Sequence, residues 1–118
     1  MNKIGALCLL TTTLGCAAAA PFEISDQQRK HFEDVVRDAE ATGAAEAPSL
    51  AAERLADAKS EFEYAQHLPL YPDRARALAD KAQADAETAL QLAQAQARTR
   101  DAAREVARHA LVVGAVTP

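Results

Sequence analysis

The stretch "ARALADKAQADAETALQLA" (Ala75–Ala93) repeats alanine at alternating intervals of four and three residues. Such intervals keep the alanines on one face of an α-helix, because the helix turns once in about 3.6 residues. No Gly or Pro interrupts the chain from Asp73 to Val112. The sequence therefore predicts one long helix with a narrow face of small residues. The repeated positions are Ala75, Ala79, Ala82, Ala86, Ala89 and Ala93, flanked by Leu78, Leu90 and Leu92.

A matching face precedes this helix in "SLAAERLADAKSEFEYAQHL" (Ser49–Leu68). Ser49 is a suitable N-cap, and Pro69 and Pro72 break the chain before the long helix. Because the connection is short, the two helices are expected to be antiparallel neighbours. The repeated positions of this second helix are Ala51, Leu55, Ala58, Phe62 and Ala65.

A shorter amphipathic helix is predicted upstream, with Ser25 or Asp26 as its N-cap and Gly43 as its stop. We expect its apolar face to pack into the groove of the hairpin. That face consists of Phe32, Val35, Val36 and Ala39. The predicted fold class is therefore all-α: an antiparallel, Ala-rich, coiled-coil-like hairpin with a long third helix and one short N-terminal helix.

The third helix is predicted to outrun its partner, since it spans roughly 60 Å and the second helix about 30 Å. Its far half, from Gln94 to Val113, is expected to lack partners within the chain. An apolar stripe of Ala93, Ala97, Val106 and Ala110 is predicted there. Such a helix is expected to fray, to self-associate or to hold another helix.

The first fifteen residues have the layout of a bacterial export signal. Lys3 provides the positive start, an apolar run follows from Ile4 to Leu14, and Gly15 precedes Cys16. The run is shorter than the roughly 18 residues that span a bilayer. It resembles a lipoprotein signal peptide, in which the cysteine receives a diacylglycerol and becomes the mature N-terminus. The predicted divisions are a signal peptide at 1–15, a tether at 16–24, a helical domain at 25–113 and a tail at 114–118.

Two other interpretations of this region remain open. An ordinary secretory signal could be cut after Ala19, and Cys8 could be the lipidated cysteine. Cys8 and Cys16 are the only cysteines, so cleavage before Cys16 leaves no pair for a disulfide. Loss of Lys3 would leave 12 basic against 17 acidic side chains. This acidic balance does not favour nucleic acid as a partner.

The combination of the signal, "EATGAAEAPSLAAERLADAKSEF" and "YPDRARALADKAQADAETALQLAQAQ" is similar to a family of uncharacterised lipoproteins of Gram-negative bacteria. The resemblance covers roughly Phe32 to Ala97 and implies an Ala-rich helical domain. Some members of that family continue into an OmpA-like domain that binds peptidoglycan. This sequence has no such segment before Pro118, so wall binding is not carried over.

The residues give no pattern for catalysis. His31, His67 and His109 are far apart and form no HExxH or comparable ligand pair, and no Gly-rich phosphate loop occurs. Pairs such as Glu33 with Arg37 are expected to be surface ion pairs along a helix. The same holds for Lys81 with Asp85. We therefore expect no enzyme activity, cofactor, metal site or small-molecule substrate.

Two surfaces are candidate interaction sites. Arg100, Arg104 and Arg108 form a basic row at four-residue spacing, which Asp101 and Glu105 can partly neutralise. Tyr64 and Tyr71 cluster at the tip of the hairpin, either as a contact patch or as packing for the turn.

The expected function is that of a lipoprotein of the cell envelope, anchored in the outer membrane through Cys16 and facing the periplasm. Ala17 after the cysteine, in place of Asp, resembles lipoproteins sorted to the outer membrane. The chain would act as a structural or interaction module, with another envelope protein or a second copy as its partner. The alternative is a soluble periplasmic binding or chaperone-like protein.

Overall fold

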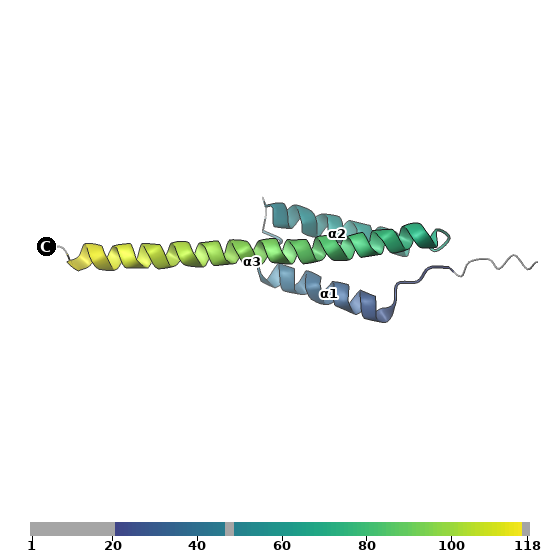
Figure 1. Cartoon of the computed structure of the whole chain (residues 1–118), viewed down its shortest axis with the longest axis horizontal. Coiled ribbons are helices and arrows are strands. Elements are labelled where there is room, and N and C mark those ends of the chain that lie inside the picture. The colour runs from purple at the N-terminus through teal and green to yellow at the C-terminus, as the bar shows by residue number, and fades with distance from the viewer. Residues whose placement is uncertain (1–20, 47–48, 117–118) are drawn as a thin grey trace, which may run out of the picture.

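The computed structural model describes residues 21–46 and 49–116, and within them the chain forms three helices (Figure 1). They are α1 (Asp26–Ala41), α2 (Leu50–Gln66) and α3 (Pro72–Val116). α2 and α3 form an antiparallel hairpin, and α1 lies against α3 beside it. The predicted all-α class, the hairpin and the long third helix are confirmed.

Local signals in the sequence set the ends of α1. The Ser25 hydroxyl accepts a hydrogen bond from the Gln28 N–H at 3.1 Å, which makes Ser25 the N-cap. At the other end Gly43 has a φ of 98°, a conformation that L side chains rarely adopt. The Ala44 N–H donates to the Ala39 carbonyl at 2.9 Å, and the Gly43 N–H donates to the Glu40 carbonyl at 3.0 Å. This Schellman pattern satisfies helix carbonyls that would otherwise be unpaired.

The two helices of the hairpin lie close to their predicted bounds, but α3 includes Pro72, which was predicted to precede it. The Ser49 hydroxyl caps α2 by accepting from the Ala52 N–H at 3.1 Å. α2 ends at Gln66, and α3 starts at Pro72, whose missing N–H costs nothing at the first position of a helix.

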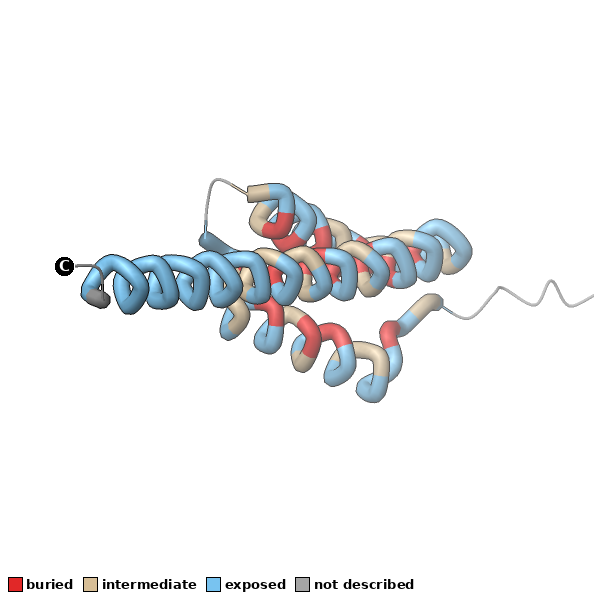
Figure 2. Tube along the Cα trace, turned by 60° about the vertical axis from the view of Figure 1, so that its left-hand side comes forward, coloured by how far each residue is buried: buried red, intermediate tan, exposed pale blue. Residues whose placement is uncertain are grey.

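Small residues line the contact between α2 and α3, which we call the alanine seam. All of the predicted seam positions are buried, and each seam alanine is at most 1 % exposed (Figure 2). Because alanine side chains are short, the two helix backbones can approach closely. The seam consists of Ala51, Leu55, Ala58, Phe62 and Ala65 on α2 and Ala75, Ala79, Ala82, Ala86, Ala89 and Ala93 on α3.

α1 packs into the groove of the hairpin, as expected. Phe32 of α1 stacks on Phe62 of α2, with ring centroids 3.9 Å apart and ring planes 5° from parallel. Val35 joins the same core cluster, and Ala39 joins a second cluster with Leu55 and the end of the seam. The three helices therefore share one thin core.

Two of the predicted divisions need correction at their edges. The segment predicted as a tether, 16–24, packs at its end, because Ile24 is only 7 % exposed and Phe22 covers the same core cluster. α3 runs on through Gly114 to Val116, so the helix enters the segment predicted as a tail from 114. A glycine within a helix costs only about 1 kcal/mol. Cys16 lies outside the described residues, as do Cys8 and the rest of the signal.

Within the described residues, the apolar runs of the helices are too short or too interrupted by charge to cross a membrane.

Candidate interaction surfaces

The far part of α3 extends beyond the other two helices, and we call residues 98–116 the overhang. Every residue from Arg98 to Ala115 is exposed (Figure 2). At 1.5 Å per residue the overhang is roughly 28 Å long. It begins slightly later than the predicted Gln94, because Gln96 and Ala97 are still partly buried.

The predicted apolar stripe of the overhang is wrong in its composition. Ala97 and Val106 are nine residues apart, which at about 100° per residue places them on opposite faces of the helix. Val106 and Ala110 instead share a face with Thr99 and Ala103, at intervals of four, three and four residues. We call these four residues the overhang stripe.

A shallow groove lies at the start of this face, near the first turn of α2. Its volume is about 360 Å³, and the overhang stripe continues from it through Thr99. The groove is lined by Leu92, Ala95, Gln96, Thr99 and Arg100.

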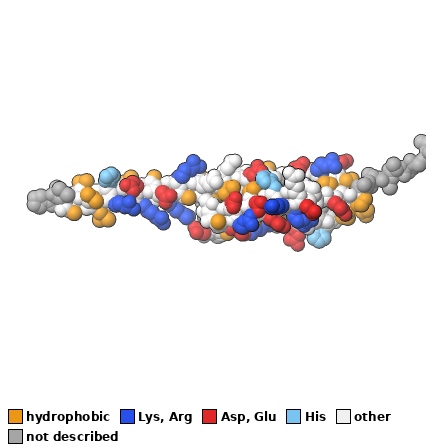
Figure 3. Space-filling view, turned by 90° about the horizontal axis from the view of Figure 1, so that it is seen from below, with side chains coloured by type: hydrophobic (Ala, Val, Ile, Leu, Met, Phe, Trp, Pro, Cys, Tyr) orange, Lys and Arg blue, Asp and Glu red, His pale blue; other side chains and the backbone are white. Residues whose placement is uncertain are grey.

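The predicted basic row lies on the overhang, but each of its arginines has an acidic neighbour. Arg100 reaches Glu46 at 3.1 Å, in the loop after α1. Arg104 lies 3.7 Å from Asp101, and Arg108 lies 3.4 Å from Glu105. These pairs are exposed and contribute little to stability. Arginine side chains still form a band along the overhang in Figure 3.

The turn between α2 and α3, residues 67–71, together with Tyr64 forms the hairpin tip. Leu70 is 83 % exposed, Tyr71 63 % and Tyr64 51 %, so these side chains do not pack the turn. His67 lies here too, with its Nδ1 atom 2.8 Å from the Glu63 carbonyl oxygen. The tip is thus an exposed apolar and aromatic surface.

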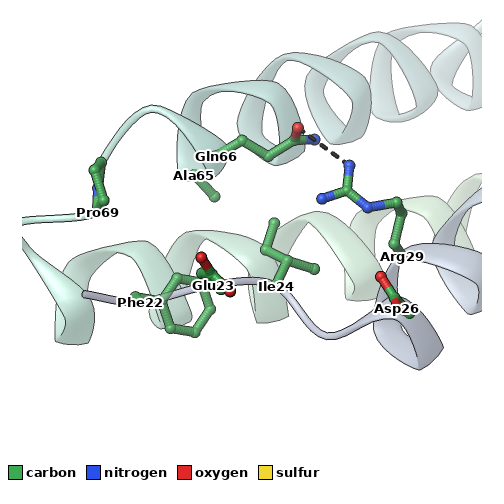
Figure 4. A pocket seen from close by; sticks show the side chains of 8 residues that line it. All are labelled: Phe22, Glu23, Ile24, Asp26, Arg29, Ala65, Gln66 and Pro69. Atoms are coloured by element: carbon green, nitrogen blue, oxygen red, sulfur yellow. Dashed lines mark hydrogen bonds between the residues drawn. The ribbon is translucent and has the colours of Figure 1, made fainter. Parts of the chain in front are cut away.

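An open cleft of about 370 Å³ separates the N-terminal segment from the end of α2 (Figure 4). The Arg29 guanidinium spans it and donates to Gln66 Oε1 at 3.3 Å. Its walls are mixed in character, with Ile24 and Ala65 beside Glu23 and Asp26. The cleft follows from the docking of residues 22–24 against the hairpin.

One group of charged side chains joins α2 to α3. Lys81 donates to Asp85 at 2.8 Å and to Glu61, and Arg54 lies 3.6 Å from Asp85. The hydrogen bond from Lys81 lowers the pKa of Asp85 below its usual value, although partial burial opposes the shift. The pKa of Lys81 is raised by its bonds to Asp85 and Glu61.

Other charged side chains form ion pairs at the surface of the protein. The predicted pair of Lys81 and Asp85 forms, but Arg37 pairs with Asp34 and not with Glu33. His31 lies 3.5 Å from Glu87 on α3. In residues 21–46 and 49–116, no group of three or more His, Cys, Asp or Glu side chains could hold a metal ion.

The chain matches no family model, no curated protein and no solved structure. The resemblance to the Gram-negative lipoprotein family therefore stays a prediction.

Proposed function

We propose that this protein is a lipid-anchored component of the cell envelope, held in the outer membrane and facing the periplasm, that acts through helix pairing and has no catalytic role. The proposed role in helix pairing rests on one observation: α3 is exposed from Arg98 to Ala115. A solvated helix of this length is only marginally stable alone, so a bound helix would stabilise it.

The proposed lipid anchor rests on the apolar run that ends at Gly15 and Cys16. A Cys16→Ser variant should lose the mass of the acyl chains and leave the membrane fraction, or accumulate as uncleaved precursor. Cys8→Ser should behave like the wild type. If Cys16→Ser keeps the wild-type mass and membrane fraction, the lipoprotein assignment is wrong. An unacylated wild-type protein in the soluble periplasmic fraction would support the alternative, a binding or chaperone-like protein.

The occupant that we assign to the overhang is a second copy of this chain, bound antiparallel. The overhang stripe repeats the small-residue spacing by which α3 already packs on α2. In an antiparallel pair the stripe of each copy faces the same stripe of the other, which gives a closed two-fold dimer. The groove beside Thr99 would receive the C-terminal turn of the partner.

Two exposed residues give a matched test of this pairing. Val106 lies on the overhang stripe, whereas Leu111 is about 140° away around the helix. The two side chains are similarly exposed, at 70 % and 76 %. Val106→Asp should abolish self-association in sedimentation equilibrium, and Leu111→Asp should leave it nearly unchanged. Equal effects of the two variants, or a wild type that stays monomeric at high concentration, would rule out the assigned face.

A further inference from the structure

The hairpin tip and the N-terminal segment lie at the same end of the molecule (Figure 1). The Phe22 N–H donates to the Pro69 carbonyl of the turn at 3.2 Å. The Arg76 guanidinium lies over the Phe22 ring, 5.8 Å from its centroid. Ile24 is buried in the core cluster of Phe62. These contacts fix the point from which the chain continues toward Cys16.

The chain between this point and the anchor is short. Phe22 is only six positions after Cys16, so even fully extended this stretch spans at most about 21 Å. If acyl chains hold Cys16 in the bilayer, Phe22 stays within that distance of the membrane surface, and the tip lies beside Phe22. Val106, on the overhang, lies about 52 Å from Tyr71 along α3.

The side chains of the tip are suited to the interface between lipid and water. Leu70 is the most exposed large apolar residue of the described chain, and Tyr71 is exposed beside it. With Arg74, both line a shallow cleft of about 290 Å³. Tyrosine places an apolar ring and a polar hydroxyl at the level of lipid headgroups, and arginine can bind their phosphates while its stem lies along apolar surface.

The charges at the tip are nearly balanced. Arg74 and Arg76 are offset by Asp73, Glu63 and Glu23. Attraction to an anionic surface is therefore weak, and the contact would depend on Leu70 and the tyrosines. This predicts similar contact with zwitterionic and anionic bilayers.

We propose that the hairpin tip, through Leu70, Tyr71 and Tyr64, contacts the surface of the bilayer that holds the anchor. This inference rests on the proposed lipid anchor. It goes beyond that anchor because it assigns a second contact with the bilayer, made by side chains of the protein.

The test uses tryptophan, which the natural sequence lacks, as a single reporter. The chain from Cys16 onward keeps both core clusters, which lie between Ile24 and Ala93. It can be coupled through the Cys16 thiol to a maleimide lipid in phosphatidylcholine vesicles. This anchors the protein whether or not cells acylate it. Tyr71→Trp is the reporter at the tip, and Val106→Trp is the matched reporter on the overhang.

In the bilayer the Tyr71→Trp emission should shift to shorter wavelength, and brominated lipid should quench most of it. The Val106→Trp emission should be quenched less. Adding Leu70→Asp to Tyr71→Trp should reduce the quenching, and vesicles with anionic lipid should give a similar result. If Tyr71→Trp is quenched no more than Val106→Trp, the tip does not touch the bilayer. Acylation of Cys16 in cells is scored separately by mass, so failure of the anchor and failure of the tip contact are distinguishable.

Discussion

Single residues link the helices of this fold to one another. Among the ionisable ones, Asp85 is the residue whose charge we expect to matter most to the stability of the fold. Its side chain is 13 % exposed and meets Lys81 on its own helix and Arg54 on α2. The hydrogen bond from Lys81 lowers the pKa of Asp85. A carboxyl with a lowered pKa stabilises the fold above its unfolded pKa, and this contribution is lost as the pH falls through the folded value.

We therefore expect Asp85→Asn to lower the free energy of unfolding near pH 7 by about 0.5 to 1 kcal/mol. The difference from the wild type should start to shrink below about pH 4 and disappear as the pH falls through the lowered pKa of the folded protein, where the wild-type carboxyl also loses its charge. Denaturation followed by circular dichroism at several pH values measures this. Asp57→Asn, at an exposed position of α2, is the control for net charge. A pH-independent difference, or an equal loss in the control, would show that the ion pairs of Asp85 contribute nothing.

At the scale of the helices, the hairpin depends on the alanine seam. Ala82 is fully buried between α2 and α3, whereas Ala84 is exposed on the same helix. Ala82→Leu should overpack the contact and cost about 1 to 3 kcal/mol, while Ala84→Leu should cost little. For a domain of this size, each kcal/mol lowers the melting temperature by about 4 to 8 °C. Equal melting temperatures for the two variants would contradict the role of the seam.

The helices and the seam could be predicted from the sequence because their signals are local and periodic. Ser49, Pro72 and Gly43 each mark a boundary by their own chemistry, and spacings of four and three fix which face is buried. The docking of Phe22 and Ile24 could not be predicted in this way. It joins two segments distant in sequence, and residues 21–24 have no periodicity.

The surfaces were less predictable than the core for a related reason. The overhang stripe was misassigned because Ala97 and Val106 are nine residues apart, about two and a half turns of helix, so that they face opposite ways. The sequence is equally compatible with Tyr64 and Tyr71 packed against the turn. Only the three-dimensional structure shows that both are exposed. The sequence therefore predicted which segments carry the candidate surfaces, but not which of their side chains lie together on one exposed face.

Over the whole molecule, charge is divided unevenly along the long axis. Between residues 21 and 97, fifteen acidic side chains face eight basic ones, whereas the chain beyond Ala97 has four arginines and two acidic residues. The hairpin tip and the start of the described chain are at one end, and the basic overhang is at the other (Figure 1, Figure 3). Any partner of the overhang must therefore accommodate positive charge.

This asymmetry makes salt a test of which partner the overhang binds. Two antiparallel overhangs bring together surfaces of like charge, so their pairing should tighten as salt rises. Between 0.1 M and 1 M salt the screening length falls from about 10 Å to about 3 Å. Sedimentation equilibrium of the chain from Cys16 onward should therefore show stronger self-association at 1 M, and a chain ending at Gln96 should stay monomeric at both concentrations. Association that weakens with salt would instead indicate that the overhang binds the acidic body of another copy. Strong hydrogen-exchange protection of residues 98–110 in a monomeric sample would mean that the overhang needs no partner, and the pairing would have to be abandoned.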